Sequence, residues 1–138
     1  MKIRSLALLC LFATAPVMAE MLKSNAPTEA KAYIISPKNG EVVPTEFTVK
    51  FGLKGMGVAP AGVQKDNTGH HHLLVDAKSL PDMNQPLGAN VTHFGGGQTE
   101  TTLKLAPGKH TLQLILGDQN HVPHHPPVLS EKITVTVK

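Results

Sequence analysis

Phe47-Thr48-Val49-Lys50-Phe51-Gly52-Leu53 is the stretch that decides the fold. Apolar residues occupy every second position, with polar residues or glycine between them. This period of two is typical of a strand with one buried face, whereas the apolar positions of a helix recur every three or four residues. The stretch therefore predicts a half-buried β-strand over residues 46–53.

The same alternation recurs on both sides of this stretch. It is clear in Leu112-Gln113-Leu114-Ile115-Leu116 and in Ile133-Thr134-Val135-Thr136-Val137, where β-branched residues favour a pleated surface. Turn signals rich in glycine and proline separate the runs, as at 37–40, 95–97 and 106–108. We expect seven strands, at residues 32–36, 46–53, 70–76, 90–94, 99–105, 110–117 and 131–137.

Seven short strands in one domain predict an all-β fold, an immunoglobulin-like β-sandwich of about seven strands. A cupredoxin-like barrel is the alternative. The sandwich is expected to occupy residues 32–138. Residues 20–31 are polar and show no periodicity, so they are interpreted as a flexible leader.

The start of the chain resembles an export signal. Lys2 and Arg4 supply a positive end, residues 5–15 are apolar, and residues 17–19 end in a small residue at a cleavage site. Residues 1–19 are therefore predicted to be a signal peptide, and the mature protein is expected to be periplasmic or secreted. No later apolar run has the roughly 18 to 20 residues that a membrane anchor needs.

Removal of residues 1–19 changes the composition. The only cysteine, Cys10, is lost, so the mature chain has no thiolate to offer a metal. Loss of Lys2 and Arg4 lowers the formal net charge from +3 to +1, and no arginine or tryptophan follows. The groups that grip phosphates and stack on bases are therefore absent, and nucleic acid is not expected as a partner.

All 8 histidines lie in the retained part, and six of them fall in two segments, 69–76 and 117–127. In an immunoglobulin-like sandwich, the connections after the second, fourth and sixth strands lie at one end of the domain. Both segments and His93 border those connections. They are therefore expected to meet at that end, while His110 should lie at the opposite end.

Alternation within the strand at 70–76 separates its histidines. His70 and His72 share one face, and His71 shares the other with Leu73, which points to the core. Imidazoles from several elements would form a set of three or four nitrogens, which suits copper or zinc. The predicted metal ligands are His70, His72, His93, His121 and His124. Asp76 or Asp118 is expected to accept the second ring N–H of a ligand.

Several ordered motifs resemble a known family: Gly69–Asp76, the stretch 93–100, the stretch 107–114 and the stretch 121–127. Together they are similar to secreted bacterial proteins grouped as domain of unknown function 4399, over about Tyr33 to Val137. The resemblance implies relatives but no activity.

The sequence thus predicts a histidine-rich periplasmic protein that binds copper or zinc for storage, delivery or sensing. One alternative is a metal-dependent enzyme, for which Glu100 or Asp118 would serve as base; no catalytic motif such as His-Glu-x-x-His occurs, and no catalytic residue is assigned. The other alternative is an interaction module that binds an envelope protein and no metal. The expected partner in the main reading is the metal ion.

Overall fold

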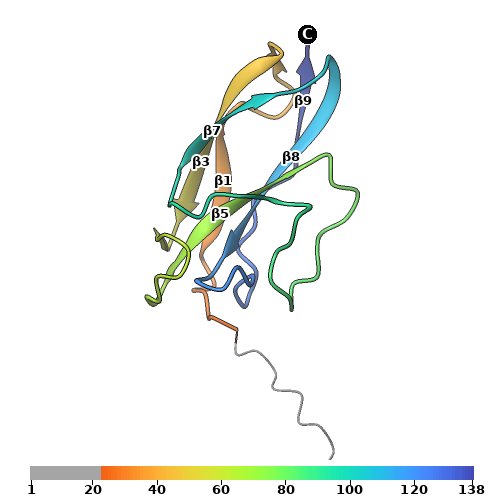
Figure 1. The fold of residues 1–138 in the computed structure, drawn as a ribbon. Helices are drawn as coiled ribbons and strands as arrows, with labels where there is room; N and C mark the ends of the chain where they lie inside the picture. The colour runs from red at the N-terminus through yellow and green to blue at the C-terminus, as the bar shows by residue number, and fades with distance from the viewer. Residues whose placement is uncertain (1–22) are drawn as a thin grey trace, which may run out of the picture.

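The computed structural model describes residues 23–138, and within them every regular element is a β-strand. The predicted signal peptide, residues 1–19, lies outside the described residues. Nine strands form two sheets that pack face to face as an open sandwich (Figure 1). The predicted all-β sandwich is confirmed, and the described strands do not close into a barrel.

The smaller sheet is antiparallel and has the order β1-β3-β7. Its strands are β1 (Lys31–Ser36), β3 (Glu46–Lys54) and β7 (Glu100–Lys104). These strands correspond to A, B and E of an immunoglobulin-like sandwich.

The larger sheet has the order β2-β9-β8-β5-β4, and β6 also pairs with β5. Its strands are β2 (Val42–Val43), β4 (Gly57–Val58), β5 (Thr68–Val75), β6 (Thr92–His93), β8 (Gly108–Gly117) and β9 (Ile133–Val137). The strands β9, β8 and β5 correspond to G, F and C.

The seven predicted strands are all present, each within two residues of the predicted bounds. The strands β2 and β4 were not predicted, because a strand of two residues is too short to show alternation. The predicted strand at 90–94 is reduced to β6, which pairs with β5 in the larger sheet.

The core lies between the two sheets and follows the predicted alternation. In β3, Phe47, Val49 and Phe51 are buried, while Thr48 and Lys50 between them are exposed. Strands β5, β8 and β9 contribute fully buried apolar side chains to this core: Leu73, Leu112, Leu114, Leu116 and Val135.

The outer face of the larger sheet is covered as well. Leu87 and Val91, from the long segment that leaves β5 and returns at β6 (Figure 1), pack on Leu74 of β5 and Ile115 of β8. Consequently β5 and the second half of β8 are buried on both faces. This cover determines the surroundings of the histidines on the outer face.

Part of the predicted leader lies against the sandwich. The N–H of Ala26 donates to the carbonyl of His125, and the N–H of His125 donates to the carbonyl of Ser24, both at 2.9 Å. Ala26 is buried. Residues 24–26 thus run beside the segment that follows β8.

The described residues contain no helix that is long and apolar enough to cross a membrane.

Candidate metal centre

Strand β5 presents His70 and His72 on the outer face of the larger sheet. It pairs with β8 along one edge and with β4 and β6 along the other, so its backbone is fixed on both sides. His71 points the opposite way, toward Phe51 of the smaller sheet, with ring centroids 5.2 Å apart. The predicted division of the three histidines between two faces is confirmed.

Two further histidines are brought to this face by tertiary pairing. His93 lies on β6, directly opposite His72 in the antiparallel register. His121 lies in the turn after β8 and has a positive φ of 68°. Leu87, from the segment that covers the sheet, donates its N–H to the carbonyl of His121 at 2.8 Å.

Asp118 shapes the turn that carries His121. Its Oδ1 accepts hydrogen bonds from the N–H groups of Asn120 (2.8 Å) and Val122 (3.0 Å), and its Oδ2 accepts one from Ser24 Oγ (2.8 Å). The carboxylate thereby pairs with two backbone N–H groups of the turn and stabilises its conformation. No hydrogen bond joins Asp118 to a ring of the cluster among the described residues, so its role is to position the turn.

The imidazoles of His70, His72, His93 and His121, here called the histidine cluster, are mutual neighbours. Their ring centroids are 4.4 to 5.9 Å apart. One potential ligand atom from each of His70, His93 and His121 lies within 4.8 Å of the others. The structure therefore brings together four of the five predicted ligands.

One distance in the cluster matches metal coordination closely. The Nε2 atoms of His70 and His93 are 3.1 Å apart. Two nitrogens that bind one ion at about 2.0 Å lie roughly 2.8 Å apart in square-planar geometry and roughly 3.3 Å apart in tetrahedral geometry. The same distance also fits a hydrogen bond in which one ring donates and the other accepts.

The cluster has a buried base and an accessible rim. His70 and His72 are at most 1% exposed, His121 is half-buried and His93 is exposed. Within residues 23–138, His70 Nδ1 and both ring nitrogens of His72 are buried with no hydrogen-bond partner. Each such group costs roughly 1 to 3 kcal/mol. A neutral imidazole has one lone pair, so a metal ion bound by His72 would satisfy one of its two nitrogens and stabilise the fold.

The surroundings keep the buried rings neutral. Burial, together with the neighbouring imidazoles His121 and His93, lowers the pKa of His70 to about 4. Burial, followed by the effect of His70, lowers the pKa of His72 to about 3. Neutral imidazole is the form that binds a metal.

The family comparison can be placed beside this geometry. The family model described as "Domain of unknown function (DUF4399)" matches residues 49–138, about two thirds of the chain. The chain belongs to this family. The matched region contains the whole histidine cluster and lacks β1 and β2. No curated protein and no solved structure matches the chain.

Glycines leave space for the rings in the DUF4399 domain. A Cβ on Gly117 would lie 2.6 Å from Cε1 of His72, and one on Gly95 would lie 2.3 Å from Cε1 of His93. Gly117 lies at the end of β8, opposite His70 of β5. Because Gly117 has no side chain, the ring of His72 can occupy the space beside it. Composition does not distinguish these glycines from turn residues, so the sequence alone gives no signal for their role beside the rings.

Gly117→Ala is expected to weaken metal binding by about 10- to 100-fold, the range seen when groups that orient metal ligands are altered. The new methyl group would push the ring of His72 away from the cluster. A competition titration with a chromophoric chelator measures the effect. Gly88→Ala is the matched control, since no atom lies within 4 Å of a Cβ at that position. Equal affinity in both variants would show that His72 is not a ligand.

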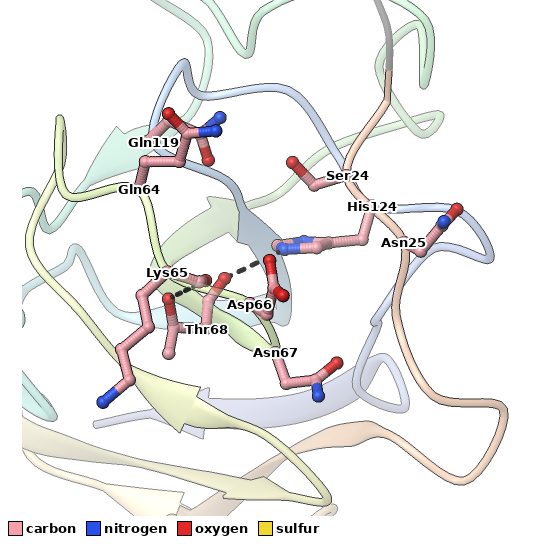
Figure 2. A pocket seen from close by; sticks show the side chains of 9 residues that line it. All are labelled: Ser24, Asn25, Gln64, Lys65, Asp66, Asn67, Thr68, Gln119 and His124. Carbon is pink, nitrogen blue, oxygen red and sulfur yellow. Dashed lines mark hydrogen bonds between the residues drawn. The ribbon is translucent and has the colours of Figure 1, made fainter.

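His124, the fifth predicted ligand, lies outside the cluster of the DUF4399 domain. It is 1% exposed, and its Nε2 donates to the carbonyl of Thr68 at 3.0 Å. Its ring lines a polar pocket of about 320 Å³. Figure 2 shows this ring with other residues of the wall, among them Asp66, Gln119 and Ser24. His125 is exposed. The hydrogen bond to Thr68 thus holds the ring of His124 apart from the cluster.

His110 lies at the opposite end of the DUF4399 domain, as predicted. Its Nδ1 is 2.7 Å from Asp76 Oδ2 and its Nε2 is 2.8 Å from the carbonyl oxygen of Ala106. Both partners are acceptors, so the protonated ring, which donates from both nitrogens, satisfies both contacts. The hydrogen bond to Asp76, followed by that to Ala106, raises the pKa of His110. Asp76 thus binds His110 and not a ring of the cluster.

The same contact lowers the pKa of Asp76. Burial alone would raise it, but the hydrogen bonds from His110 and from the Thr111 N–H outweigh burial. The folded pKa of His110 lies above its unfolded value. The contribution of His110 to the free energy of unfolding is therefore complete below about pH 6.5 and is lost as the pH rises through the folded pKa. The contribution of Asp76 is lost only as the pH falls through its lowered pKa.

Asp76→Asn is expected to lower the pKa of His110 and to reduce the free energy of unfolding at pH 6 by roughly 1 kcal/mol or less, because the pair is partly exposed. This reduction should become smaller at pH 9 than at pH 6, because the raised pKa of His110 means that the ion pair is lost as the pH rises through that pKa. Asparagine tolerates the positive φ of 55° at this position. An NMR titration of His110 and denaturant unfolding at both pH values measure the two effects. An unchanged His110 pKa would contradict the ion pair.

Proposed function

We propose that this protein binds one transition-metal ion, copper or zinc, at the histidine cluster, and stores, delivers or senses that metal in the periplasm. The observation that carries the proposal is the convergence of four imidazoles from three separate elements, with three potential ligand atoms within 4.8 Å. The periplasmic location rests on residues 1–19 of the sequence.

The donor set favours these two metals. Imidazole nitrogen suits copper and zinc, whereas calcium and magnesium require oxygen ligands. After removal of residues 1–19 the chain contains no cysteine, so thiolate cannot compete for the ion. A set of four imidazole ligands matches a tetrahedral zinc ion or a tetragonal copper(II) ion.

The arrangement of the cluster suits uptake and release. His70 and His72 are held by a strand that is paired on both edges, whereas His93 is exposed and His121 is half-buried. An ion can therefore exchange through the side that His93 and His121 form, while the buried pair remains in place. This asymmetry favours a metal carrier over an interaction module in which histidines are only polar surface groups.

The test is a metal titration of the mature protein purified without a His tag. Isothermal titration calorimetry with Cu(II) and with Zn(II), together with elemental analysis, is expected to give one ion per chain. His121→Ala should lose most of the affinity. His125→Ala, whose side chain is exposed, is the matched control and should bind like the wild type. Binding that is absent, or that is equally strong in both variants, would refute the proposal.

A further inference from the structure

We infer that residues 24–26, here called the N-terminal strap, belong to the metal centre, because they hold the turn that carries His121 and thereby control how fast the ion leaves. This inference rests on the proposed metal binding and names its regulation. The attached strap retains the ion, and a detached strap releases it. The strap lies outside the region that the family model matches, which begins at residue 49.

The backbone of the strap pairs with the segment that follows β8. The N–H of His125 donates to the carbonyl of Ser24, and the N–H of Ala26 donates to the carbonyl of His125, both at 2.9 Å. Asn25 and His125 thus form a parallel bridge. Figure 2 shows Ser24 and Asn25 in the wall of the same pocket as His124. This pairing brings the side chain of Ser24 to the turn at the end of β8.

The hydroxyl of Ser24 binds the carboxylate that shapes this turn. Ser24 Oγ donates to Asp118 Oδ2 at 2.8 Å. Asp118 Oδ1 accepts hydrogen bonds from the N–H groups of Asn120 and Val122. Among residues 23–138, Ser24 is the sole side-chain donor to this carboxylate. Asp118 is 1% exposed, so loss of the hydroxyl would leave Oδ2 buried without a partner. The carboxylate would then turn toward another donor, and its hold on the two N–H groups would weaken.

The direction of the His121 ring depends on this turn. His121 lies between the two residues whose N–H groups Asp118 binds, and its own N–H donates to the Asp118 carbonyl at 2.9 Å. Its φ of 68° is in the left-handed region, which a residue with a side chain occupies when its surroundings hold it there. A loosened turn therefore moves this imidazole away from the cluster, while His70 and His72 stay on β5.

Asp118 also places a negative charge within reach of the cluster. Burial, followed by the effects of His121 and His93, lowers the pKa of His70, whereas the Asp118 carboxylate acts to raise it. A carboxylate that favours a proton on His70 also favours a metal cation bound to that ring. The ion pairs of the described residues do not include Asp118, so its charge is available to a bound ion. The Ser24 hydroxyl keeps this charge in place.

The strap can detach while the sheets stay intact. It is held by two backbone hydrogen bonds and by the Ser24 hydroxyl, and Ala26 is its only buried residue. The strand β5, in contrast, is paired along both edges. Segments with few buried contacts open at a lower free energy than core strands do. Opening of the strap would thus loosen His121 first, and the ion could leave through the side that His93 and His121 form.

The experiment compares the wild type with Ser24→Ala and Ser24→Thr, each as the mature chain loaded with one equivalent of Zn(II). Stopped-flow mixing with excess chromophoric chelator measures how fast zinc leaves. Ser24→Ala is expected to release zinc about 10-fold faster, the lower end of the range for groups that orient metal ligands. Ser24→Thr keeps the hydroxyl and should release zinc at a rate close to that of the wild type. Ser79→Ala, at an exposed position between β5 and β6, is the matched control and should behave like the wild type.

Two further measurements separate positioning of His121 from a general loss of stability. In the metal-free protein, hydrogen exchange at the amides of Asn120 and Val122 should be faster in Ser24→Ala than in the wild type, with no change at the amides of β5. With Cu(II) bound, the hyperfine splitting in the electron paramagnetic resonance spectrum should change in Ser24→Ala, because one ring has moved. It should not change in Ser24→Thr.

The outcomes separate the two proposals. If zinc binds and all four proteins release it at the same rate, the strap inference is wrong and the metal-binding function stands. If Ser24→Thr releases zinc as fast as Ser24→Ala, or if exchange in Ser24→Ala is faster throughout β5, the hydroxyl does not act through the turn and the inference is also wrong. If the wild type binds neither zinc nor copper, both proposals fail.

Discussion

Addition of a modest excess of Zn(II) or Cu(II) at pH 7.5 should raise the melting temperature of the mature protein by roughly 10 °C or more. A ligand at about a thousandfold above its Kd adds about 4 kcal/mol to the free energy of unfolding, and a domain of this size gains a few degrees per kcal/mol. The metal would also accept lone pairs from rings that are otherwise buried without a partner, such as that of His72.

Variants separate specific binding from a general effect of metal on the surface. His72→Ala should abolish the shift, as should His121→Ala, which removes a half-buried ring from a turn and leaves the strands intact. His125→Ala should show the full shift. Differential scanning calorimetry with and without metal, and with excess chelator, measures each case. A shift of the same size in all four proteins would contradict binding at the cluster.

His71→Leu should stabilise the metal-free protein by about 1 to 3 kcal/mol at pH 7.5. His71 is fully buried in the core against Phe51, and neither ring nitrogen has a hydrogen-bond partner within residues 23–138. Leucine fills a similar volume and removes the cost of the two unpaired polar atoms. Chemical denaturation of both proteins measures the difference.

The stabilisation by His71→Leu should be about 2 kcal/mol larger at pH 5 than at pH 7.5, because burial lowers the pKa of His71 to about 4 in the wild type. At pH values between the unfolded pKa of about 6.5 and the folded pKa, the imidazole of His71 is protonated in the unfolded chain and neutral in the folded chain. The stability that neutral His71 preserves is therefore present above pH 6.5 and is lost as the pH falls toward 4.

Two results bear on the His71 prediction. His125→Leu is the control and should change stability by less than about 0.5 kcal/mol at either pH. If His71→Leu is less stable than the wild type at both pH values, the packing of the ring on Phe51 outweighs its unpaired nitrogens. If the difference does not depend on pH, His71 does not titrate as a buried group.

Local patterns in the sequence predicted most of the strands of the fold. Alternation together with the turn signals between the runs located every described strand of more than two residues, since a strand with one face in a core repeats with a period of two. The same alternation separated His71 from its two neighbours before any contact was known. The immunoglobulin-like order then implied that His93 and the residues after β8 would lie near β5.

Long-range packing decided the details that sequence patterns could not. The pairing of β6 with β5 sets His93 opposite His72, and the segment that carries Leu87 and Val91 covers the outer face. That cover explains why Ile115 is buried although it stands at an alternate, outward position. The base of the cluster is also buried, whereas the sequence predicted only that these histidines meet at one end of the domain.

By itself, the sequence determined where the longer strands lie, which face each histidine of β5 occupies, and that His110 lies apart from the cluster, because these follow from backbone periodicity and strand order. Only the tertiary structure decided that His121 joins the cluster while His124 turns to the carbonyl of Thr68. Both lie in one irregular segment, where no period relates neighbouring side chains. Their directions depend on the turn that Asp118 holds and on the contacts made by residues far away in the chain.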